Sequence, residues 1–283
     1  MRNHPSPPPT SVSHALFDAK DYWETRLREH PGLCGVGNTC MGRSYIQWLY
    51  KVRHAVFLRL LSSLKIDPRT AQVFDVGSGT GFYLEIWKQV GVSSITGCDL
   101  TEIAVARLES ALPWARILRL DIGDPLPASE MGRYDIVSAF DVLFHIVEEK
   151  QYERAIGNVC ALLRPGGLLV FSELLVRNGA RQAEYMVCRP LKEVTALLAA
   201  TGFEVLCRVP MFVLMEAPLD SASQWYRFFW KLMTYPVKRS DLAGFVIGGM
   251  LYPLELILTK VFAESPTTEI VVCRKRRQEV FAK

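Results

Sequence analysis

The clearest pattern along the chain is a series of short apolar runs, each followed by glycine or aspartate and then by an amphipathic stretch. The first run, 71–74, leads into Asp75 and a glycine-rich turn at 77–81. Further runs of this kind lie at 94–98, 115–120, 134–140 and 168–172. Buried strands that alternate with helices predict an α/β fold with a doubly wound, mostly parallel sheet.

The segments on either side of this series add helices and two more strands. Helical patterns are predicted at 18–29, 45–64 and 189–200, and strands at 203–209 and 268–273. Between the last two strands lies an apolar insertion, residues 217–265. Within it, 242–262 is rich enough in apolar residues to suggest a membrane span. It also contains Pro253, Glu255 and Lys260, so we expect two helices broken near Tyr252–Pro253 and packed as a lid.

Length and composition set the domain organisation. The 283 residues are 49% hydrophobic with a net charge of +4, which is typical of one large domain with an insertion. We divide it into a disordered tail (1–14), an N-terminal helical cap (15–70) and a core domain (71–283) that includes the insertion. The mild charge does not indicate nucleic acid. The cysteines form no C-x-x-C pair, so we predict no metal and a reduced, cytoplasmic setting.

The glycine turn carries the first chemical signal. Gly77, Gly79 and Gly81 occupy every second position, so the backbone can approach a ligand closely and adopt conformations closed to other residues. The helix predicted to follow, 82–90, would direct its free N–H groups at an anionic group. Asp99 ends the second strand and is placed to accept hydrogen bonds from ribose hydroxyls. A nucleotide-like cofactor is therefore expected at this edge of the sheet.

Five motifs in a fixed order carry a family resemblance. They are Asp75-Val76-Gly77-Ser78-Gly79-Thr80-Gly81, Asp99, Asp121-Ile122, Tyr134-Asp135-Ile136-Val137 and Leu163-Arg164-Pro165-Gly166-Gly167. Over residues 71–173 the chain resembles the class I S-adenosylmethionine (SAM)-dependent methyltransferases. The resemblance implies SAM as cofactor and seven strands, the last of them antiparallel between the fifth and the sixth. The spacing G-x-G-x-G also departs from the dinucleotide fingerprint G-x-G-x-x-G.

The resemblance also implies roles for individual residues. Gly77, Gly79 and Gly81 would wrap the methionine and ribose, Asp99 would bind the ribose hydroxyls, and Asp121 would accept from the adenine amino group. The other implied cofactor contacts are Asp75, Ser78, Leu100, Ile122 and the backbone of Phe140. Two of these assignments have structural alternatives, because Asp75 could instead cap its turn and Asp121 could be a simple turn residue.

The sequence indicates less clearly which residues would contact the methyl acceptor. His145 follows the fourth strand, where it could act as a general base towards a hydroxyl acceptor, or cap or pack against the following helix. Asp141 could serve as base or position the acceptor. Arg43 and Tyr45 could close over the methionine carboxylate, or cap a helix and carry surface charge. Four aromatic residues of the insertion could line an acceptor pocket or pack in the lid: Trp225, Tyr226, Phe228 and Trp230.

These observations favour methyl transfer to a small, apolar organic acceptor, directed at oxygen or carbon. The fourth strand ends in Phe140-Asp141-Val142-Leu143, without the Asn/Asp-Pro-Pro-aromatic motif of enzymes that methylate nucleobase amino groups. Alternatives are methylation of a membrane lipid or quinone, a non-catalytic SAM-binding partner protein, and an NAD-dependent oxidoreductase. Contact with a membrane surface through 224–262 would make the cytoplasmic protein peripheral to a membrane. The acceptor and the oligomeric state stay open.

Overall fold

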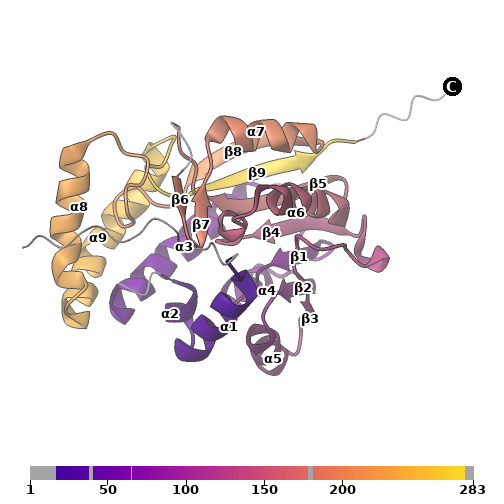
Figure 1. Cartoon of the computed structure of the whole chain (residues 1–283), viewed down its shortest axis with the longest axis horizontal. Coiled ribbons are helices and arrows are strands. Elements are labelled where there is room, and N and C mark those ends of the chain that lie inside the picture. The colour runs from indigo at the N-terminus through magenta and orange to yellow at the C-terminus, as the bar shows by residue number, and fades with distance from the viewer. Residues whose placement is uncertain (1–16, 38–40, 65, 178–180, 278–283) are drawn as a thin grey trace, which may run out of the picture.

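The computed structural model describes residues 17–37, 41–64, 66–177 and 181–277. Seven strands form one sheet in the order β3-β2-β1-β4-β5-β9-β8 (Figure 1). Their bounds are β1 (Gln72–Val76), β2 (Ser94–Asp99), β3 (Arg116–Arg119), β4 (Tyr134–Ala139), β5 (Leu163–Glu173), β8 (Phe203–Pro210) and β9 (Glu269–Lys275). Strand β9 pairs antiparallel with both β5 and β8. The predicted mostly parallel sheet with one inserted antiparallel strand is confirmed.

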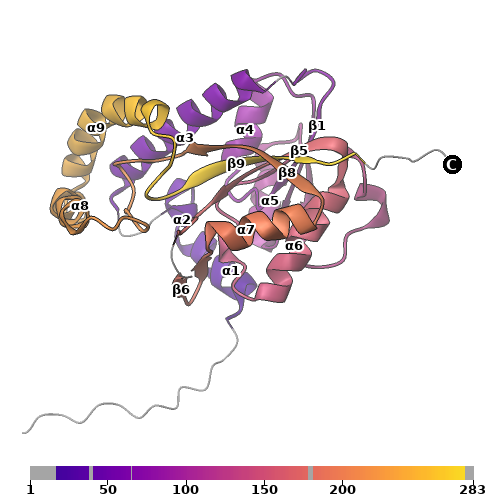
Figure 2. The same ribbon diagram turned by 90° about the horizontal axis from the view of Figure 1, so that it is seen from above.

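Helices cover both faces of this sheet (Figure 2). They are α3 (Arg43–Ser63), α4 (Phe82–Gln89) and α5 (Glu102–Ala111) on one face, with α6 (Glu149–Leu162) and α7 (Leu191–Ala200) on the other. The alternation of the central strands explains the two cores, since neighbouring residues of a strand point to opposite faces. Val73 and Ile136 lie in one core, while Phe74 and Val137 lie in the other.

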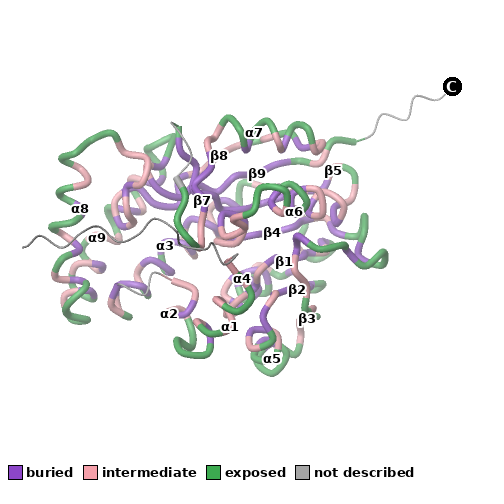
Figure 3. Tube along the Cα trace, in the orientation of Figure 1, coloured by how far each residue is buried: buried purple, intermediate pink, exposed green. Residues whose placement is uncertain are grey.

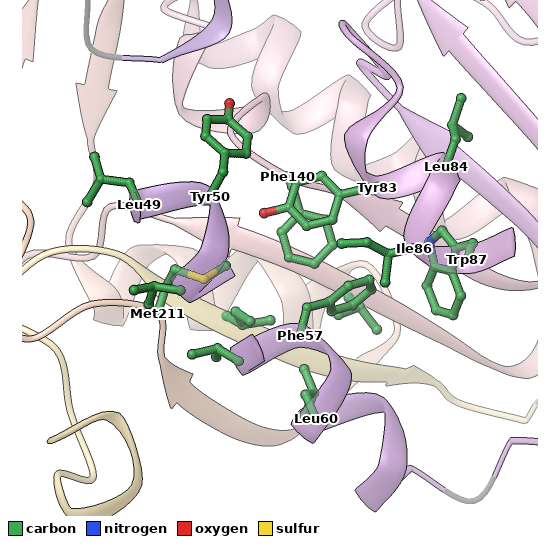
Figure 4. Close-up of a cluster of buried hydrophobic side chains, with 14 of the residues drawn as sticks. Leu49, Tyr50, Phe57, Leu60, Tyr83, Leu84, Ile86, Trp87, Phe140 and Met211 are labelled. Atoms are coloured by element: carbon green, nitrogen blue, oxygen red, sulfur yellow. The ribbon is translucent and has the colours of Figure 1, made fainter. Parts of the chain in front are cut away.

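Aromatic side chains fill the core beneath α3 and α4 (Figure 4). Phe57 of α3 packs its ring edge against Tyr83, Trp87 and Phe140, with centroids 5.4, 5.2 and 4.8 Å away. Tyr83 stacks on Phe140, which follows β4, with centroids 3.9 Å apart. This packing fixes α4 and the end of β4 relative to each other, and both border the candidate site.

Several short elements lie near the carboxyl ends of the parallel strands. They are α1 (Ala19–Glu29), α2 (Leu33–Val36), the 3₁₀ turn η2 (Leu143–His145), and the hairpin β6 (Arg181–Ala183) and β7 (Met186–Cys188). A second 3₁₀ turn, η1 (Ala128–Glu130), lies at the opposite edge, where Arg116 at the start of β3 donates to Glu130 at 2.6 Å. Arg26 of α1 donates from Nε to the backbone oxygen of Gly35 at 2.8 Å. Arg107 of α5 donates to the backbone oxygen of Leu27 at 2.8 Å. These bonds tie α1 to α2 and to the sheet domain.

The insertion contains two helices, α8 (Gln224–Val237) and α9 (Asp241–Val261), at one end of the molecule (Figure 1). The prediction of a break near Tyr252–Pro253 is wrong, because α9 continues through Pro253. A proline inside a helix removes one hydrogen bond, here to the carbonyl of Gly249, and packing along the rest of α9 outweighs that loss. The predicted tail, 1–14, lies outside the described residues, and the division into cap, core and insertion stays a prediction.

Candidate functional site

A cavity of about 210 Å³ opens at the carboxyl ends of β1, β2 and β4, beneath α1 and α2. In parallel α/β sheets this edge is where ligands bind. Its lining includes these predicted residues: Gly77, Ser78, Gly79, Asp99, Leu100, Asp121, Ile122, Phe140, Asp141 and His145. They come from the ends of four strands, and the fold therefore brings most of the predicted site residues to one place.

The glycine loop has the backbone that its sequence predicted. Gly77, Gly79 and Gly81 all have positive φ, at 65°, 51° and 83°, a region that side-chain-bearing residues rarely adopt. A Cβ on Gly77 would lie 2.2 Å from a methyl carbon of Val142. Gly81 does not line the cavity, and a Cβ there would meet Leu112 at 2.7 Å. Gly81 therefore serves the packing of α4, whereas Gly77 and Gly79 form the cavity wall.

Asp75 is buried behind the loop rather than in the cavity lining. Its Oδ1 accepts a hydrogen bond from Ser138 Oγ at 2.6 Å, and Trp87 Nε1 donates to the same Ser138 oxygen at 3.0 Å. Burial raises the pKa of Asp75 to about 7. The Asp75 side chain therefore links β1 to β4 and, through Ser138, to α4.

Asp99 and Asp121 occupy the ends of β2 and β3. Asp99 accepts from the Gly79 N–H at 2.9 Å and from the Thr101 N–H and hydroxyl at 3.0 and 2.7 Å. Burial raises the pKa of Asp99, although these hydrogen bonds oppose that effect. Asp121 accepts from the Gly123 N–H at 2.8 Å and from Gln151 Nε2 at 3.2 Å. Each carboxylate oxygen has two acceptor positions, so both side chains can also accept from a ligand.

Asp141 is the one non-glycine residue with positive φ, at 57°, among the described residues. Its carboxylate binds Arg53 Nη1 at 2.5 Å and accepts from Ser172 Oγ at 3.1 Å, and its N–H donates to that same hydroxyl oxygen at 2.7 Å. Arg53 is itself buried and also lies 3.7 Å from Glu216. Arg53 and Ser172 occupy both carboxylate oxygens of Asp141, so this geometry suits a positioning role for Asp141 better than proton transfer.

His145 stands in the η2 turn at the cavity wall. Its Nδ1 lies 2.8 Å from the backbone oxygen of Tyr185. A carbonyl oxygen only accepts hydrogen bonds, so Nδ1 carries the proton and Nε2 keeps its lone pair. Burial lowers the pKa of His145 to about 4. The ring is therefore neutral at pH 7, with a nitrogen that can accept a hydrogen bond.

Sequence reasoning missed the aromatic residues around His145. Trp23 of α1 lines the cavity and packs edge-on against the His145 ring at 4.8 Å. Tyr185, in the turn of the β6–β7 hairpin, stacks on Tyr22 at 5.5 Å. The pattern of 18–29 predicted the helix, but local spacing could not show which aromatic side chains would meet the cavity. Val36 of α2 is a further unpredicted wall residue, 3.1 Å from where a Gly79 Cβ would lie.

Other predicted site residues lie elsewhere. Tyr45 is buried and donates its hydroxyl to the backbone oxygen of Met215 at 2.7 Å, and Arg43 is exposed. Neither lines the cavity, so their predicted closure over the methionine carboxylate is not what the structure shows. The four aromatic residues of the insertion are also absent from its walls. Trp225 and Phe228 are exposed and Trp230 is buried against the core, because the insertion packs on α3 rather than over the cavity.

The cavity lining fits a nucleoside cofactor. Asp99 and Asp121 provide carboxylates at two strand ends for hydroxyl and amino groups, and Leu100 and Ile122 provide apolar surface for a base. Gly77 and Gly79 have no side chains, so a ligand can approach the loop backbone closely at these two wall positions. Nothing in this lining requires a metal.

The family of the chain follows from comparison with known proteins. A sequence profile of the methyltransferase domain family matches residues 48–208, more than half of the chain. The chain belongs to this family, the class I SAM-dependent methyltransferases, and SAM is its cofactor. The predicted family and cofactor are confirmed, and the NAD-dependent alternative is set aside.

Curated relatives cover only part of the chain. The ubiquinone biosynthesis O-methyltransferase of Bordetella avium strain 197N is 34% identical over 131 residues, which is 44% of this chain and 53% of that protein. The protein of the same name from Xanthomonas axonopodis pv. citri strain 306 is 34% identical over 116 residues, 40% of this chain and 46% of that protein. The chain thus spans about half the length of the curated relatives it matches.

Solved structures share the fold. A chain from the Haloferax volcanii complex with the Trm112 methyltransferase activator has a TM-score of 0.57 at 12% identity, covering 92% of this chain and 98% of that chain. The [4+2]-cyclase SpnF has a TM-score of 0.50 at 21% identity, covering 78% and 80%. At these identities the likeness shows the fold alone, and a cyclase among the neighbours illustrates that the fold does not fix the reaction.

Proposed function

We propose that this protein transfers a methyl group from SAM to a hydroxyl oxygen of a small aromatic acceptor. The observation that carries this proposal is His145, with its Nδ1 bonded to the Tyr185 carbonyl and its ring against Trp23, in the lining of the same cavity as Asp99 and the glycine loop. The names of the relatives, which are O-methyltransferases, support the choice of oxygen over carbon.

The aromatic wall would position the acceptor. Trp23 lines the cavity beside His145 and offers a flat apolar surface, on which an aromatic ring packs favourably, while Tyr185 supports His145 by stacking on its ring. The acceptor hydroxyl would donate its hydrogen bond to His145 Nε2. When bound, SAM supplies an electrophilic methyl carbon on a sulfonium, which leaves as a neutral thioether. The chain's main task is then alignment of the hydroxyl oxygen with that carbon and exclusion of water by α1 and α2.

The weak basicity of His145 is compatible with this role. As the oxygen–carbon bond forms, the hydroxyl proton becomes strongly acidic, so a base with a pKa of about 4 can accept it. The proton moves from the acceptor oxygen to Nε2 while Nδ1 keeps its bond to the Tyr185 carbonyl. Asp141, fixed by Arg53, would shape the wall next to the transferred group without taking the proton.

A transfer assay with radiolabelled SAM and a panel of phenols and catechols tests the proposal. We expect methyl ether products and a loss of turnover in His145→Gln without a matching loss of S-adenosylhomocysteine affinity. If the cofactor product binds but no phenol or catechol is methylated above the enzyme-free rate, the proposal fails. The non-catalytic SAM-binding alternative would then be favoured.

A lipid-tailed quinone precursor is the second candidate acceptor. The relatives are named for ubiquinone biosynthesis, and α9 exposes a row of apolar side chains. Comparing turnover of a soluble catechol with that of a polyprenylated catechol in vesicles separates the two. Higher kcat/KM for the vesicle-borne substrate supports the quinone candidate, and higher kcat/KM for the soluble substrate rejects it. Either acceptor fits a cytoplasmic enzyme, which we propose as its setting.

A further inference from the structure

Helix α9 has the reverse of the usual polarity of a surface helix. Its buried positions are Gly244, Gly248, Glu255 and Thr259. Its exposed positions include Leu242, Phe245, Val246, Met250, Leu254, Ile257 and Val261. A helix on a soluble domain normally turns its apolar stripe to the core and its polar residues to water. Here the fully buried positions are small or polar, partly buried residues such as Ile247 and Leu251 also pack against the protein, and the exposed large apolar residues face outward.

Specific contacts hold this inner face. A Cβ on Gly248 would lie 2.4 Å from the Trp48 ring of α3, so only glycine allows this approach. Glu255 accepts from the backbone N–H groups of Val213 and Leu214 at 2.6 and 2.8 Å. Arg59 of α3 donates to the backbone oxygen of Thr259 at 2.9 Å. The orientation of α9 is therefore fixed by its polar and small residues, and its apolar face has no covering element among the described residues.

The neighbouring helix α8 extends the same surface. It exposes Trp225, Phe228, Phe229, Leu232 and Tyr235. Of the 15 exposed large hydrophobic residues in the described chain, 13 lie between Trp225 and Phe262. Figure 3 shows exposed stretches along both helices. An apolar surface this concentrated marks an interaction site.

The charges around this surface indicate what binds it. Four cations of the two helices and of the turn between them are exposed: Lys231, Lys238, Arg239 and Lys260. The two carboxylates of the same helices are occupied. Glu255 is buried, and Asp241 accepts from the Ser44 N–H and hydroxyl at 2.9 and 2.6 Å. A cationic, apolar surface complements an anionic lipid surface, whereas a second copy of the same surface would repel it.

We propose that the α8–α9 surface docks onto an anionic lipid bilayer, with both helices lying in its interfacial plane. Helix α9 is the one described helix long and apolar enough to cross a membrane, a property that is weak evidence by itself. If α9 crossed the membrane, lipid would surround it on all sides. Glu255 would then lose its hydrogen bonds to the protein, and the contact with Trp48 would be broken. Docking keeps these contacts and covers only the outer face. This inference is independent of the proposed reaction.

Flotation of the purified full chain with vesicles tests the docking. Vesicles of phosphatidylcholine alone are compared with vesicles that also contain phosphatidylglycerol. We expect the wild-type protein to float with the anionic vesicles, less so at high salt. The triple variant Leu242→Gln/Met250→Gln/Val261→Gln changes three of the most exposed side chains and should lose at least about tenfold in vesicle affinity.

Two further variants serve as controls. Met131→Gln/Leu206→Gln removes the two exposed large hydrophobic residues outside this surface and should float like the wild type. Lys238→Glu/Arg239→Glu should lose the preference for anionic vesicles. An unchanged thermal shift with S-adenosylhomocysteine verifies that each variant is folded. Equal flotation of the triple variant and the wild type would overturn the proposal. So would a wild-type protein that stays with the soluble fraction, or a dimer in solution that the triple variant abolishes.

Discussion

The carboxyl ends of strands β1 to β4 form a rim around the cavity. This rim and helix α9 both contain buried polar groups, but these groups serve different purposes. At the rim, Asp99 and Asp141 have internal partners and still face a cavity. In α9, Glu255 and Thr259 bond to the protein, and the outer face is apolar apart from Asp241 and Lys260 near the helix ends. The rim is built to receive a polar ligand from inside a pocket, and α9 is built to present apolar surface to something outside. Each prediction below challenges one side of this contrast.

The largest effect is expected at the glycine loop. Gly77→Ala adds a Cβ at a φ of 65° and 2.2 Å from Val142, so both strain and crowding oppose it. We expect a loss of about 2–4 kcal/mol in the free energy of unfolding, with loss of cofactor binding. Gly132→Ala is the matched control, because φ there is 62° and a Cβ would meet nothing within 4 Å. It should cost only about 1–2 kcal/mol. If urea denaturation showed the same loss in the free energy of unfolding for both variants, the loop would not be crowded at Gly77.

The next effect concerns catalysis at the rim. His145→Gln should lower kcat by about 10²-fold, the lower end for general bases, since the imidazole is a weak one. Because burial lowers the pKa of His145 to about 4, its ring stays neutral as pH rises from 6 to 8. The wild-type pH–rate profile should therefore show no His145 step near pH 6.5. Such a step, abolished in the variant, would contradict the buried, neutral imidazole.

A smaller effect is expected on the inner face of α9. Gly248→Ala gains helix propensity, but its Cβ would lie 2.4 Å from the Trp48 ring, so we expect a net loss of about 1–2 kcal/mol in stability. Gly157→Ala in α6 has nothing within 4 Å of its Cβ and should instead gain about 0.5–1 kcal/mol. Should both substitutions stabilise the protein in urea denaturation, the close α3–α9 packing would be rejected.

The sequence could predict residues whose position depends on strand order, but not residues whose position depends on how separate elements dock. Rim residues such as Asp99 and Asp121 were predictable because each follows an apolar run, and parallel strands bring their carboxyl ends to one edge. Trp23 and Tyr185 were not, because their meeting with His145 depends on how α1 and a hairpin dock on the sheet. Tyr45 illustrates the opposite error, since the sequence suggested a ligand contact where the structure places a hydrogen bond to the backbone oxygen of Met215.

The break in the insertion was predicted wrongly for a related physical reason. Pro253 suggested that the helical pattern ends near Tyr252–Pro253. The structure shows an unbroken helix that packs through Gly244 and Gly248, the residues with the least apolar surface to bury. Apolar composition alone predicts burial, and only the tertiary contacts show which face of a helix is the buried one.

Calorimetric titration with S-adenosylhomocysteine tests the central claim, that the rim binds the cofactor, most directly. The wild-type chain should bind one equivalent. Asp99→Ala should bind about 10–100-fold more weakly, since it leaves ligand hydroxyl groups without an acceptor. Asp124→Ala, at a carboxylate outside the cavity lining, should bind like the wild type. No heat of binding for the wild type, or unchanged affinity in Asp99→Ala, would contradict the account.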